Sequence, residues 1–451
     1  MRALAVRRRL LDSSASALDS PPSKLDSSAP KIDHWLLLTP LFATLFLSKW
    51  RTPVGPSDFA MAWPLIFGAV LVGLAIGRMR FEPRRLLAYL FLLGLLGAIQ
   101  VLRGDPFSLS SLLLMMSIYL TYTVAVNQSS KIDVFRVLTL FASIVAICGL
   151  AQFSLQFVLP RAAVFPIENL LPNSMLIQNY NMQIPLSYGS KILKANGIFA
   201  LEPSFYSQFL AVAIIAELSM AGRLARIALY GAGMLVAYSG TGIIVLLVTL
   251  PVVMIIKRRA DLLLMGLLIL LLLALFAEPL NLSVFLERAG EFSSKGSSGF
   301  ERFTGALYLF EQFLWNDPSR ALLGFGPGSF ASFAARADLP VAEMALTKII
   351  FEFGLIGGFA ILFFLGYCVT RSAAPGSVKL AVAVMFAMSG IYTAVSHGIA
   401  LSLLVWSAGY AATAAQPAQS AQSARTAKRQ KRLQAAVLGR RGARAMPPAM
   451  E

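Results

Sequence analysis

One stretch decides the fold class: Val134-Phe-Arg-Val-Leu-Thr-Leu-Phe-Ala-Ser-Ile-Val-Ala-Ile-Cys-Gly-Leu-Ala-Gln-Phe-Ser-Leu-Gln-Phe-Val-Leu159. Its single charged residue is Arg136, close to one end. A helix that crosses a bilayer needs about 20 mostly apolar residues, and this stretch is long enough. It therefore predicts a membrane-spanning helix.

Similar apolar stretches recur along the chain of 451 residues. Hydrophobic residues make up 57% and charged residues 14%, against about 25% charged in soluble domains, so an ordinary soluble enzyme is excluded. We predict an all-α, polytopic membrane protein with about twelve transmembrane helices, or eleven, because the first and seventh candidates are short. The candidates are Trp35–Leu47, Phe59–Ile76, Leu86–Leu102, Leu109–Val126, Val134–Leu159, Ser204–Ala221, Ile227–Tyr238, Gly242–Ile256, Leu262–Ala277, Ala345–Val369, Lys379–Ser396 and Ile399–Ala414.

The net charge of +17 follows the expected membrane topology. In a soluble protein such an excess would indicate nucleic-acid binding, but here the basic residues alternate between loops, so no nucleic-acid partner is predicted. The short loops on one side hold only Lys49, Arg51 and Arg103. Because Lys and Arg are retained in the cytoplasm, the richer loops and both termini are predicted to be cytoplasmic. The richer loops carry Arg78, Arg80, Arg84, Arg85, Lys131, Arg136, Arg223, Arg226, Lys257, Arg258, Arg259, Arg371 and Lys379.

The membrane domain is expected to cover residues 34–414, between two polar ends. Residues 1–33 are rich in Ser, Pro and Asp, which predicts a disordered cytoplasmic arm. Residues 415–451 form a basic cytoplasmic tail, either solvated or lying on anionic membrane lipid. The two cysteines lie in apolar runs and the two histidines are far apart, so no metal site is predicted.

Two outer segments, 160–202 and 278–340, are long, and long loops are where function concentrates. In the first, Glu202 precedes Pro203, which suits a helix start. The carboxylate is either a simple helix cap or a group that orients an arginine or binds a sugar hydroxyl. In the second, Phe300, Phe303, Leu307, Phe310 and Leu314 recur at helical spacing and predict an amphipathic helix that rests on the membrane or the bundle. Arg302 in its first turn is disfavoured by the helix dipole and calls for an anionic partner.

Two further motifs follow. The glycines of Gly324-Phe-Gly326-Pro-Gly328-Ser-Phe330 allow a tight turn or a backbone-amide nest for a phosphate. Lys348 and Glu352 are four residues apart, which predicts a structural ion pair on one helix face. Glu343, near the outer interface and with no local partner, is the better candidate for chemistry.

These motifs together resemble the O-antigen ligase/polymerase superfamily. The resemblance rests on Asn196-Gly-Ile-Phe…Glu202-Pro-Ser, Ser239-Gly-Thr-Gly242, Arg302, Gly324-Phe-Gly-Pro-Gly-Ser-Phe330 and Glu352-Phe-Gly-Leu-Ile-Gly357, and covers about residues 35–414. It implies a bacterial inner-membrane glycosyltransferase that acts at the periplasmic face on polyprenyl-diphosphate-linked oligosaccharides, holds the diphosphate with arginines and needs no metal or other cofactor. It also implies a flippase and a chain-length regulator as pathway partners.

One departure favours a Wzy-type polymerase over a ligase. Ligases of the family carry a His-Asn pair about nine residues before the Glu-x-Gly that matches Glu352-Phe-Gly354, whereas this chain has Glu343-Met344. We therefore expect Glu343 to act as general base, with its carboxylate partly desolvated. A ligase of the same superfamily and a transporter of polysaccharide or lipid-linked sugar remain the alternatives.

Arginine suits the diphosphate because it is always charged and binds phosphate bidentately. Arg302 is expected to be the main clamp. The substrate-binding residues expected beside it are Glu202, Arg336, Arg320, Lys194, Arg161, Gly326 and Gly328. For each of these arginines, a solvated loop charge is the alternative interpretation.

Overall fold

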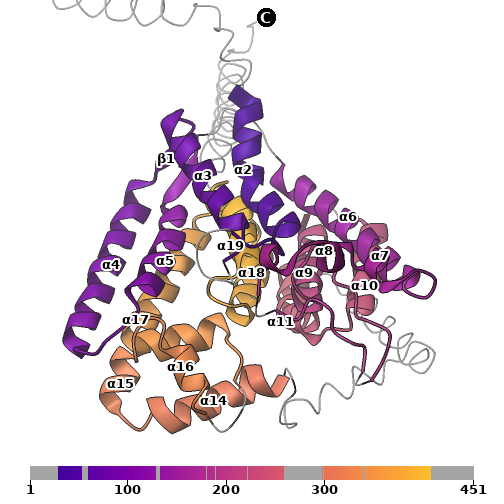
Figure 1. The fold of residues 1–451 in the computed structure, drawn as a ribbon. Helices are drawn as coiled ribbons and strands as arrows, with labels where there is room; N and C mark the ends of the chain where they lie inside the picture. Colours follow the sequence, from indigo (N-terminus) through magenta and orange to yellow (C-terminus); the bar gives the residue numbers. More distant parts are fainter. Residues whose placement is uncertain are drawn as a thin grey trace, which may run out of the picture.

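The computed structural model describes most of the membrane domain in a mostly helical arrangement (Figure 1). The described residues are 29–52, 59–127, 133–178, 180–187, 189–220, 222–257, 297, 299–337, 339 and 341–407. The predicted span Leu262–Ala277, residues 278–296 of the second outer segment, the tail 415–451 and most of the N-terminal arm lie outside them. Within the arm, the helical structure already begins at Ala29, earlier than expected.

The elements follow one another along the chain as helices with two short strands. They are α2 (Ala29–Phe46), α3 (Ala62–Ala75), β1 (Met79–Phe81), α4 (Pro83–Arg103), α5 (Leu109–Leu120), η1 (Thr121–Thr123), β2 (Val124–Val126), α6 (Val134–Leu155), α7 (Arg161–Val164), α8 (Pro166–Leu170), η2 (Asn173–Met175), α9 (Pro203–Met220), α10 (Leu224–Ala237), α11 (Gly240–Lys257), η3 (Phe300–Thr304), α14 (Gly305–Leu309), η4 (Phe310–Leu314), α15 (Pro318–Leu323), α16 (Phe330–Ala334), α17 (Ala345–Thr370), α18 (Gly376–Met388), α19 (Ala394–Ala400) and η5 (Leu401–Val405).

Three of the described helices, α4, α6 and α17, are long and apolar enough to cross a membrane. Seven further apolar helices are shorter, so the structure supports a membrane-associated helical protein without fixing the count of spans. The predicted spans differ from the helices where polar residues intervene. Residues 124–126 form a strand, and the region expected as the spans Lys379–Ser396 and Ile399–Ala414 is instead broken between Met388 and Ala394.

Local sequence explains how α4 and α5 are joined. The Glu82 carboxylate accepts from the Arg85 backbone N–H, and Pro83 occupies the first turn of α4. Gly104 ends the helix in the left-handed conformation, with φ of +72°. Ser108 then caps α5 by accepting from the Ser111 backbone N–H. The connection between α4 and α5 is therefore only residues 104–108, and its charged residue Asp105 lies at the same end as Arg103.

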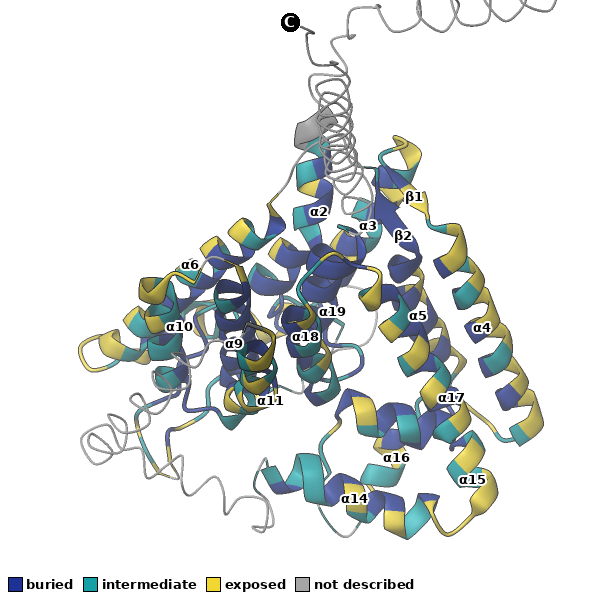
Figure 2. Cartoon of the chain, turned by 180° about the vertical axis from the view of Figure 1, so that it is seen from behind, coloured by how far each residue is buried: buried dark blue, intermediate teal, exposed yellow. Residues whose placement is uncertain are grey.

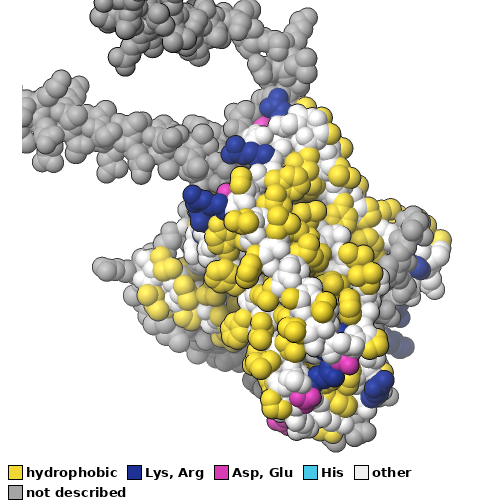
Figure 3. Space-filling model, turned by 90° about the vertical axis from the view of Figure 1, so that its left-hand side faces the viewer, with side chains coloured by type: hydrophobic (Ala, Val, Ile, Leu, Met, Phe, Trp, Pro, Cys, Tyr) yellow, Lys and Arg dark blue, Asp and Glu magenta, His cyan; other side chains and the backbone are white. Residues whose placement is uncertain are grey.

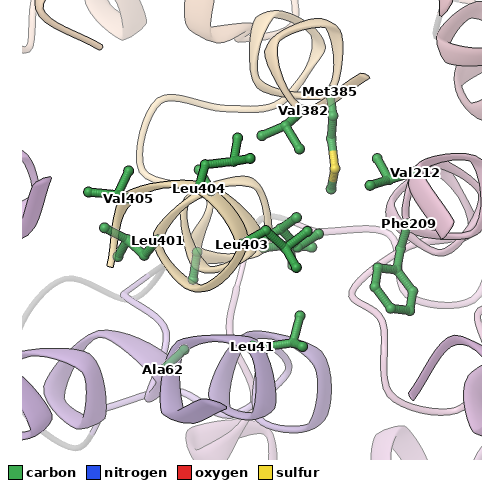
Figure 4. Close-up of a cluster of buried hydrophobic side chains, with 14 of the residues drawn as sticks. Leu41, Ala62, Phe209, Val212, Val382, Met385, Leu401, Leu403, Leu404 and Val405 are labelled. Atoms are coloured by element: carbon green, nitrogen blue, oxygen red, sulfur yellow. The ribbon is translucent and has the colours of Figure 1, made fainter. Parts of the chain in front are cut away.

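Helix α9 forms the centre of one half of the bundle, packed by α6, α10, α11 and α18. Nearly all of its residues are buried, including the polar Gln208 and Glu217. Figure 4 shows where this half meets the N-terminal helices: Leu401, Leu403 and Leu404 of η5 lie between Leu41 of α2 and the side chains of α18. Because α9 has neighbours on every face, its position in the bundle is fixed. Glu202, the residue directly before α9, is therefore held in place as well.

Figure 2 shows that α4 has many exposed residues along its outward side, and the large exposed side chains of α4 and α17 are apolar. Phe91 is 72% exposed and Phe363 is 75% exposed, which would be costly in water over such a continuous surface. Figure 3 shows a hydrophobic zone in the middle of this face, Lys and Arg towards the top, and mixed acidic and basic side chains near the bottom. This distribution is the one that a bilayer requires.

Contacts at the two ends of the bundle agree with the expected alternation of loops. The strands β1 and β2 pair antiparallel, with Arg80 opposite Ala125, so the α3–α4 and α5–α6 connections meet at one end. At the other end, the Ser108 backbone N–H donates to the Pro327 carbonyl at 2.9 Å. We call the latter the α14–α16 end, because α14, α15 and α16 lie there in Figure 1.

Candidate functional site

One continuous helical segment, made of η3, α14 and η4, lies at the α14–α16 end. The amphipathic helix was predicted correctly in place, and most of its predicted face is buried: Phe300, Phe310 and Leu314 are buried, whereas Leu307 is 62% exposed. The first and last turns are π-helical, which shifts the faces relative to a 3.6-residue period. Phe310 and Leu314 pack in one cluster with Phe351 of α17.

Arg302 and Glu202 meet although they belong to different outer segments. The Arg302 Nη2 lies 3.4 Å from the Glu202 Oε2. Glu202 is also held by the Ser204 hydroxyl, which donates to Oε2 at 3.0 Å, and by the Asn181 backbone N–H, which donates to Oε1 at 3.2 Å. Arg302 thus has the anionic partner that its place in the first helical turn called for, and Glu202 orients an arginine. Beside it, burial raises the pKa of the Glu301 carboxyl.

Glu343 differs from expectation in one respect. Its carboxylate is not without a local partner, because Oε2 lies 2.7 Å from the Lys348 Nζ. Lys348, one turn into α17, reaches back towards the segment that precedes the helix. The Glu343 side chain is 34% exposed, so part of it is removed from water.

Lys348 joins two carboxylates. The predicted pair with Glu352 is present, with Nζ to Oε1 at 3.8 Å, and the Glu352 side chain is 1% exposed. Lys348 also lies over the ring of Tyr392, 4.9 Å from its centroid. The result is a row of charges, Glu343–Lys348–Glu352, running from the surface into the protein.

Backbone hydrogen bonds hold this row beside the Arg302–Glu202 pair. The Ala342 N–H donates to the Glu301 carbonyl at 3.0 Å, so the residues directly preceding Glu343 and Arg302 are bonded to each other. The Ala345 N–H donates to the Ser389 carbonyl, and the Ser389 hydroxyl donates to Gln208 on α9 at 3.4 Å. These bonds place the backbone that carries Glu343 beside the backbone that carries Arg302, and we treat Arg302, Glu202 and Glu343 as one candidate site.

The glycine motif packs against a break in α17. Gly354 has φ of +64° and ψ of −172°, which interrupts the helix two residues after Glu352. The freed carbonyls of Phe351 and Glu352 accept from the backbone N–H groups of Phe325 and Gly326 at 3.0 and 2.7 Å. The Glu352 Oε1 accepts from the Phe330 N–H at 3.2 Å. These backbone amides of the glycine motif therefore donate their hydrogen bonds to α17 and to its buried Glu352 carboxylate.

Arg320 and the two central glycines form a second group. Arg320 forms ion pairs with Asp105 and, at 3.9 Å, with Asp317, and lies over the Phe325 ring. Its hydrogen bond to Asp105 lowers the pKa of that carboxyl. Gly326, with φ of +94°, lies against the Arg103 guanidinium, where any Cβ would collide. Gly328 in the same way lies against Ser108.

The remaining predicted residues are Arg161, Arg336 and Lys194. Arg161 on α7 is exposed and donates from Nε to the Gln183 side chain at 2.6 Å; α7 and α14 are far apart in Figure 1. Arg336 is exposed and stacks on Phe333 at 5.4 Å. Lys194 is buried, with 6% exposure, and its backbone N–H donates to Ile184.

Sequence reasoning missed several residues that build the site. Asp105 had no visible role, because its partner Arg320 is 215 residues away in the chain. Lys49 was counted only as a loop cation, yet it is fully buried against Glu168, which in turn accepts from Asn196 at 2.9 Å. Burial lowers the pKa of Lys49 to about 8, against the opposing effect of Glu168. Lys49 and Asn196 each stand beside an apolar run, and this position was the available sign in the sequence that their polar side chains are buried.

The arrangement offers a cation for a developing anion and a carboxylate for a proton. Arginine can hold phosphate oxygens, and Glu202 fixes its direction. The Glu343 carboxylate is accessible, as a general base must be. Among the described residues, no group of three or more His, Cys, Asp and Glu is placed to hold a metal ion.

Comparison with known proteins adds no family to this description. No protein-family model matches the chain, and no curated protein sequence matches it.

Proposed function

We propose that the chain is a bacterial inner-membrane polysaccharide polymerase, which joins polyprenyl-diphosphate-linked oligosaccharide repeat units at the periplasmic face. The observation that carries the proposal is the union of Arg302, Glu202 and Glu343 in one site at the α14–α16 end. The apolar outer faces of α4 and α17 support a membrane setting, in which the lipid part of such a substrate would be dissolved.

In this reaction a sugar hydroxyl of one repeat unit attacks the anomeric carbon of another. Glu343 takes the hydroxyl proton, the new glycosidic bond forms, and the bond between the anomeric carbon and the diphosphate oxygen breaks. The diphosphate leaves with the electron pair, and Arg302 stabilises the charge that builds on it. A single displacement of this kind inverts the anomeric configuration.

Lys348 holds Glu343 in position. It sits between Glu343 and the buried Glu352, and its ammonium group pairs with the carboxylate that takes the proton. When Glu343 accepts the proton, Lys348 remains paired with Glu352, so no buried charge is left without a partner. Arg320 and Gly328 would contact the glycan away from the bond that breaks.

The test is reconstitution of the full chain in vesicles with a polyprenyl-diphosphate-linked repeat unit. We expect longer lipid-linked oligomers and released polyprenyl diphosphate. Arg302→Ala and Glu343→Gln should abolish the oligomers while the protein level stays normal. Lys191→Ala, a change of an exposed cation, is the control.

Three results would contradict parts of the proposal. Oligomers of normal length and amount from both variants would remove the site assignment. Transfer of the glycan only to a different acceptor would identify a ligase. Movement of the lipid-linked unit across the bilayer without bond formation would identify a transporter.

A further inference from the structure

A pocket of about 440 Å³ opens at the α14–α16 end, and neither Arg302, Glu202 nor Glu343 lines it. Its walls come from three segments far apart in sequence: the α4–α5 connection, α15, and residues 325–333. We call it the α4–α15 pocket. Its volume falls within the range of pockets that hold small molecules.

The apolar part of the α4–α15 pocket consists of phenylalanine rings. Phe107 comes from the α4–α5 connection and is 38% exposed. Phe325 and Phe333 face it from the other segment, with their ring centroids 4.4 Å apart. A guanidinium group lies over each ring, from Arg103, Arg320 and Arg336 respectively. The aromatic surface that stays open to the pocket can pack against the C–H groups on one face of a pyranose ring.

The polar part consists of one ion pair and several hydroxyl groups. The Asp105 carboxylate and the Arg320 guanidinium hold each other in place, and both line the pocket. Ser329 and Ser332 also line it, and each donates its hydroxyl hydrogen to a backbone carbonyl, at 2.7 Å in both cases. Their oxygens keep lone pairs that can accept from a ligand, so the pocket offers acceptors on Asp105 and the serines and donors on Arg320.

The pocket is formed before any ligand binds. Gly326 and Gly328, at φ of +94° and +81°, bring the backbone against Arg103 and Ser108. The Ser108 N–H donates to the Pro327 carbonyl across the same contact. A preformed pocket loses less conformational entropy on binding than a flexible loop does.

We propose that the α4–α15 pocket is a saccharide-binding subsite that receives one pyranose ring of the glycan, with phenylalanine rings on its apolar face and Asp105, Arg320 and the serine hydroxyls on its hydroxyl groups. That the ring belongs to a lipid-linked glycan rests on the proposed function. Recognition of a sugar by the pocket does not.

The subsite is tied to Glu343 through α17. Gly326 donates to the Glu352 carbonyl and Phe330 donates to its carboxylate, and Glu352 pairs with Lys348, the partner of Glu343. The segment 325–333 that lines the pocket is therefore hydrogen-bonded to α17, the helix whose Lys348 pairs with the proton acceptor. Such a subsite would keep one repeat unit aligned while another reacts.

The test uses ligand-detected saturation-transfer NMR on the full chain in phospholipid nanodiscs. The probes are the methyl glycosides of glucose, galactose, mannose and rhamnose, at millimolar concentration. We expect saturation of the ring protons of at least one glycoside, and binding weakened about tenfold or more by Phe333→Leu and by Phe107→Leu. Phe157→Leu changes a ring that is 62% exposed outside the pocket and should leave binding unchanged.

Asp105→Asn breaks the ion pair with Arg320, so its thermal unfolding is measured beside its binding. Arg302→Ala should retain sugar binding although it abolishes polymer, which separates failure of the subsite from failure of the proposed function. The proposal is overturned if no glycoside shows saturation, or if Phe333→Leu and Phe107→Leu bind as the wild type does. It is also overturned if inorganic pyrophosphate displaces the glycoside in an Arg320-dependent manner, which would identify a phosphate site.

Discussion

Arg302 and Glu202 are 100 residues apart in the chain and form an ion pair, with Nη2 and Oε2 separated by 3.4 Å. The arginine side chain is 22% exposed and the glutamate side chain 12%. A mostly buried carboxylate therefore orients the guanidinium, while part of the guanidinium faces outwards. Such a geometry suits an arginine that binds an anion from outside.

This pair predicts different effects for the two partners. Arg302→Lys keeps the charge but loses the planar fork, so we expect the rate of polyprenyl diphosphate release to fall by about 10²- to 10³-fold. Glu202→Gln leaves the arginine in place without its orienting charge, and we expect a fall of about tenfold. Equal rates for Glu202→Gln and the wild type would show that Glu202 has no orienting role. Lys191→Ala is again the control.

A second prediction concerns the stability that Lys348 gives to Glu352. Lys348→Met leaves a carboxylate with 1% exposure without its ammonium neighbour, and we expect the free energy of unfolding to fall by about 3 kcal/mol. Adding Glu352→Gln removes the buried charge and should recover a large part of that loss. Unfolding in urea or SDS measures both variants, and Lys191→Ala serves as the exposed control. If the double variant has the same free energy of unfolding as Lys348→Met alone, the pairing of Lys348 with Glu352 is contradicted.

Membrane orientation gives a third prediction. With Cys148 and Cys368 replaced, Asn316→Cys in the segment of Arg302 should react with a membrane-impermeant maleimide added from the periplasmic side. Arg80→Cys on β1, at the opposite end of the bundle, should react only after the membrane is opened. Both native positions are exposed, so their accessibility is matched. Labelling in the reverse order would place Arg302 and Glu343 in the cytoplasm and overturn the proposed function.

The long helices could be predicted from the sequence because an apolar run is a local property. The expected span Ala345–Val369 is the helix Ala345–Thr370, and Ser204–Ala221 is Pro203–Met220. The predicted span Lys379–Ser396 was too long, because α18 ends at Met388 and a non-helical segment with Ser389 and Thr393 follows it. In the helix at 300–314, Leu307 was wrongly expected on the buried face, because π-helical turns alter the helical period and the composition does not predict such turns.

The candidate site could be predicted only in part. Arg302 and Glu202 were both selected, because each stands at a helix start where a charge matters. The partner of Glu343 was missed, because an extended lead-in lets a side chain five residues on reach back. Asp105 could not be found, because its ion pair with Arg320 depends on how α15 packs on α17 beside the end of α4.

The break at Gly354 gives the last prediction, because it positions both the glycine motif and Glu352. Gly354 has φ of +64°, where an L side chain is strained by about 1 kcal/mol or more, and an added Cβ would lie 2.3 Å from the Leu322 carbonyl oxygen. Gly354→Ala should therefore lower the free energy of unfolding by at least about 2 kcal/mol and reduce polymer formation, since α15 must move away from α17. Gly366→Ala lies in the same helix with nothing within 4 Å of the added Cβ, and should be neutral or stabilising by up to about 1 kcal/mol. If the two alanine variants unfold alike, the break is not required by the packing of α15. A Gly354→Ala variant that is destabilised yet forms polymer at the normal rate would show that the position of Glu352 does not control the reaction.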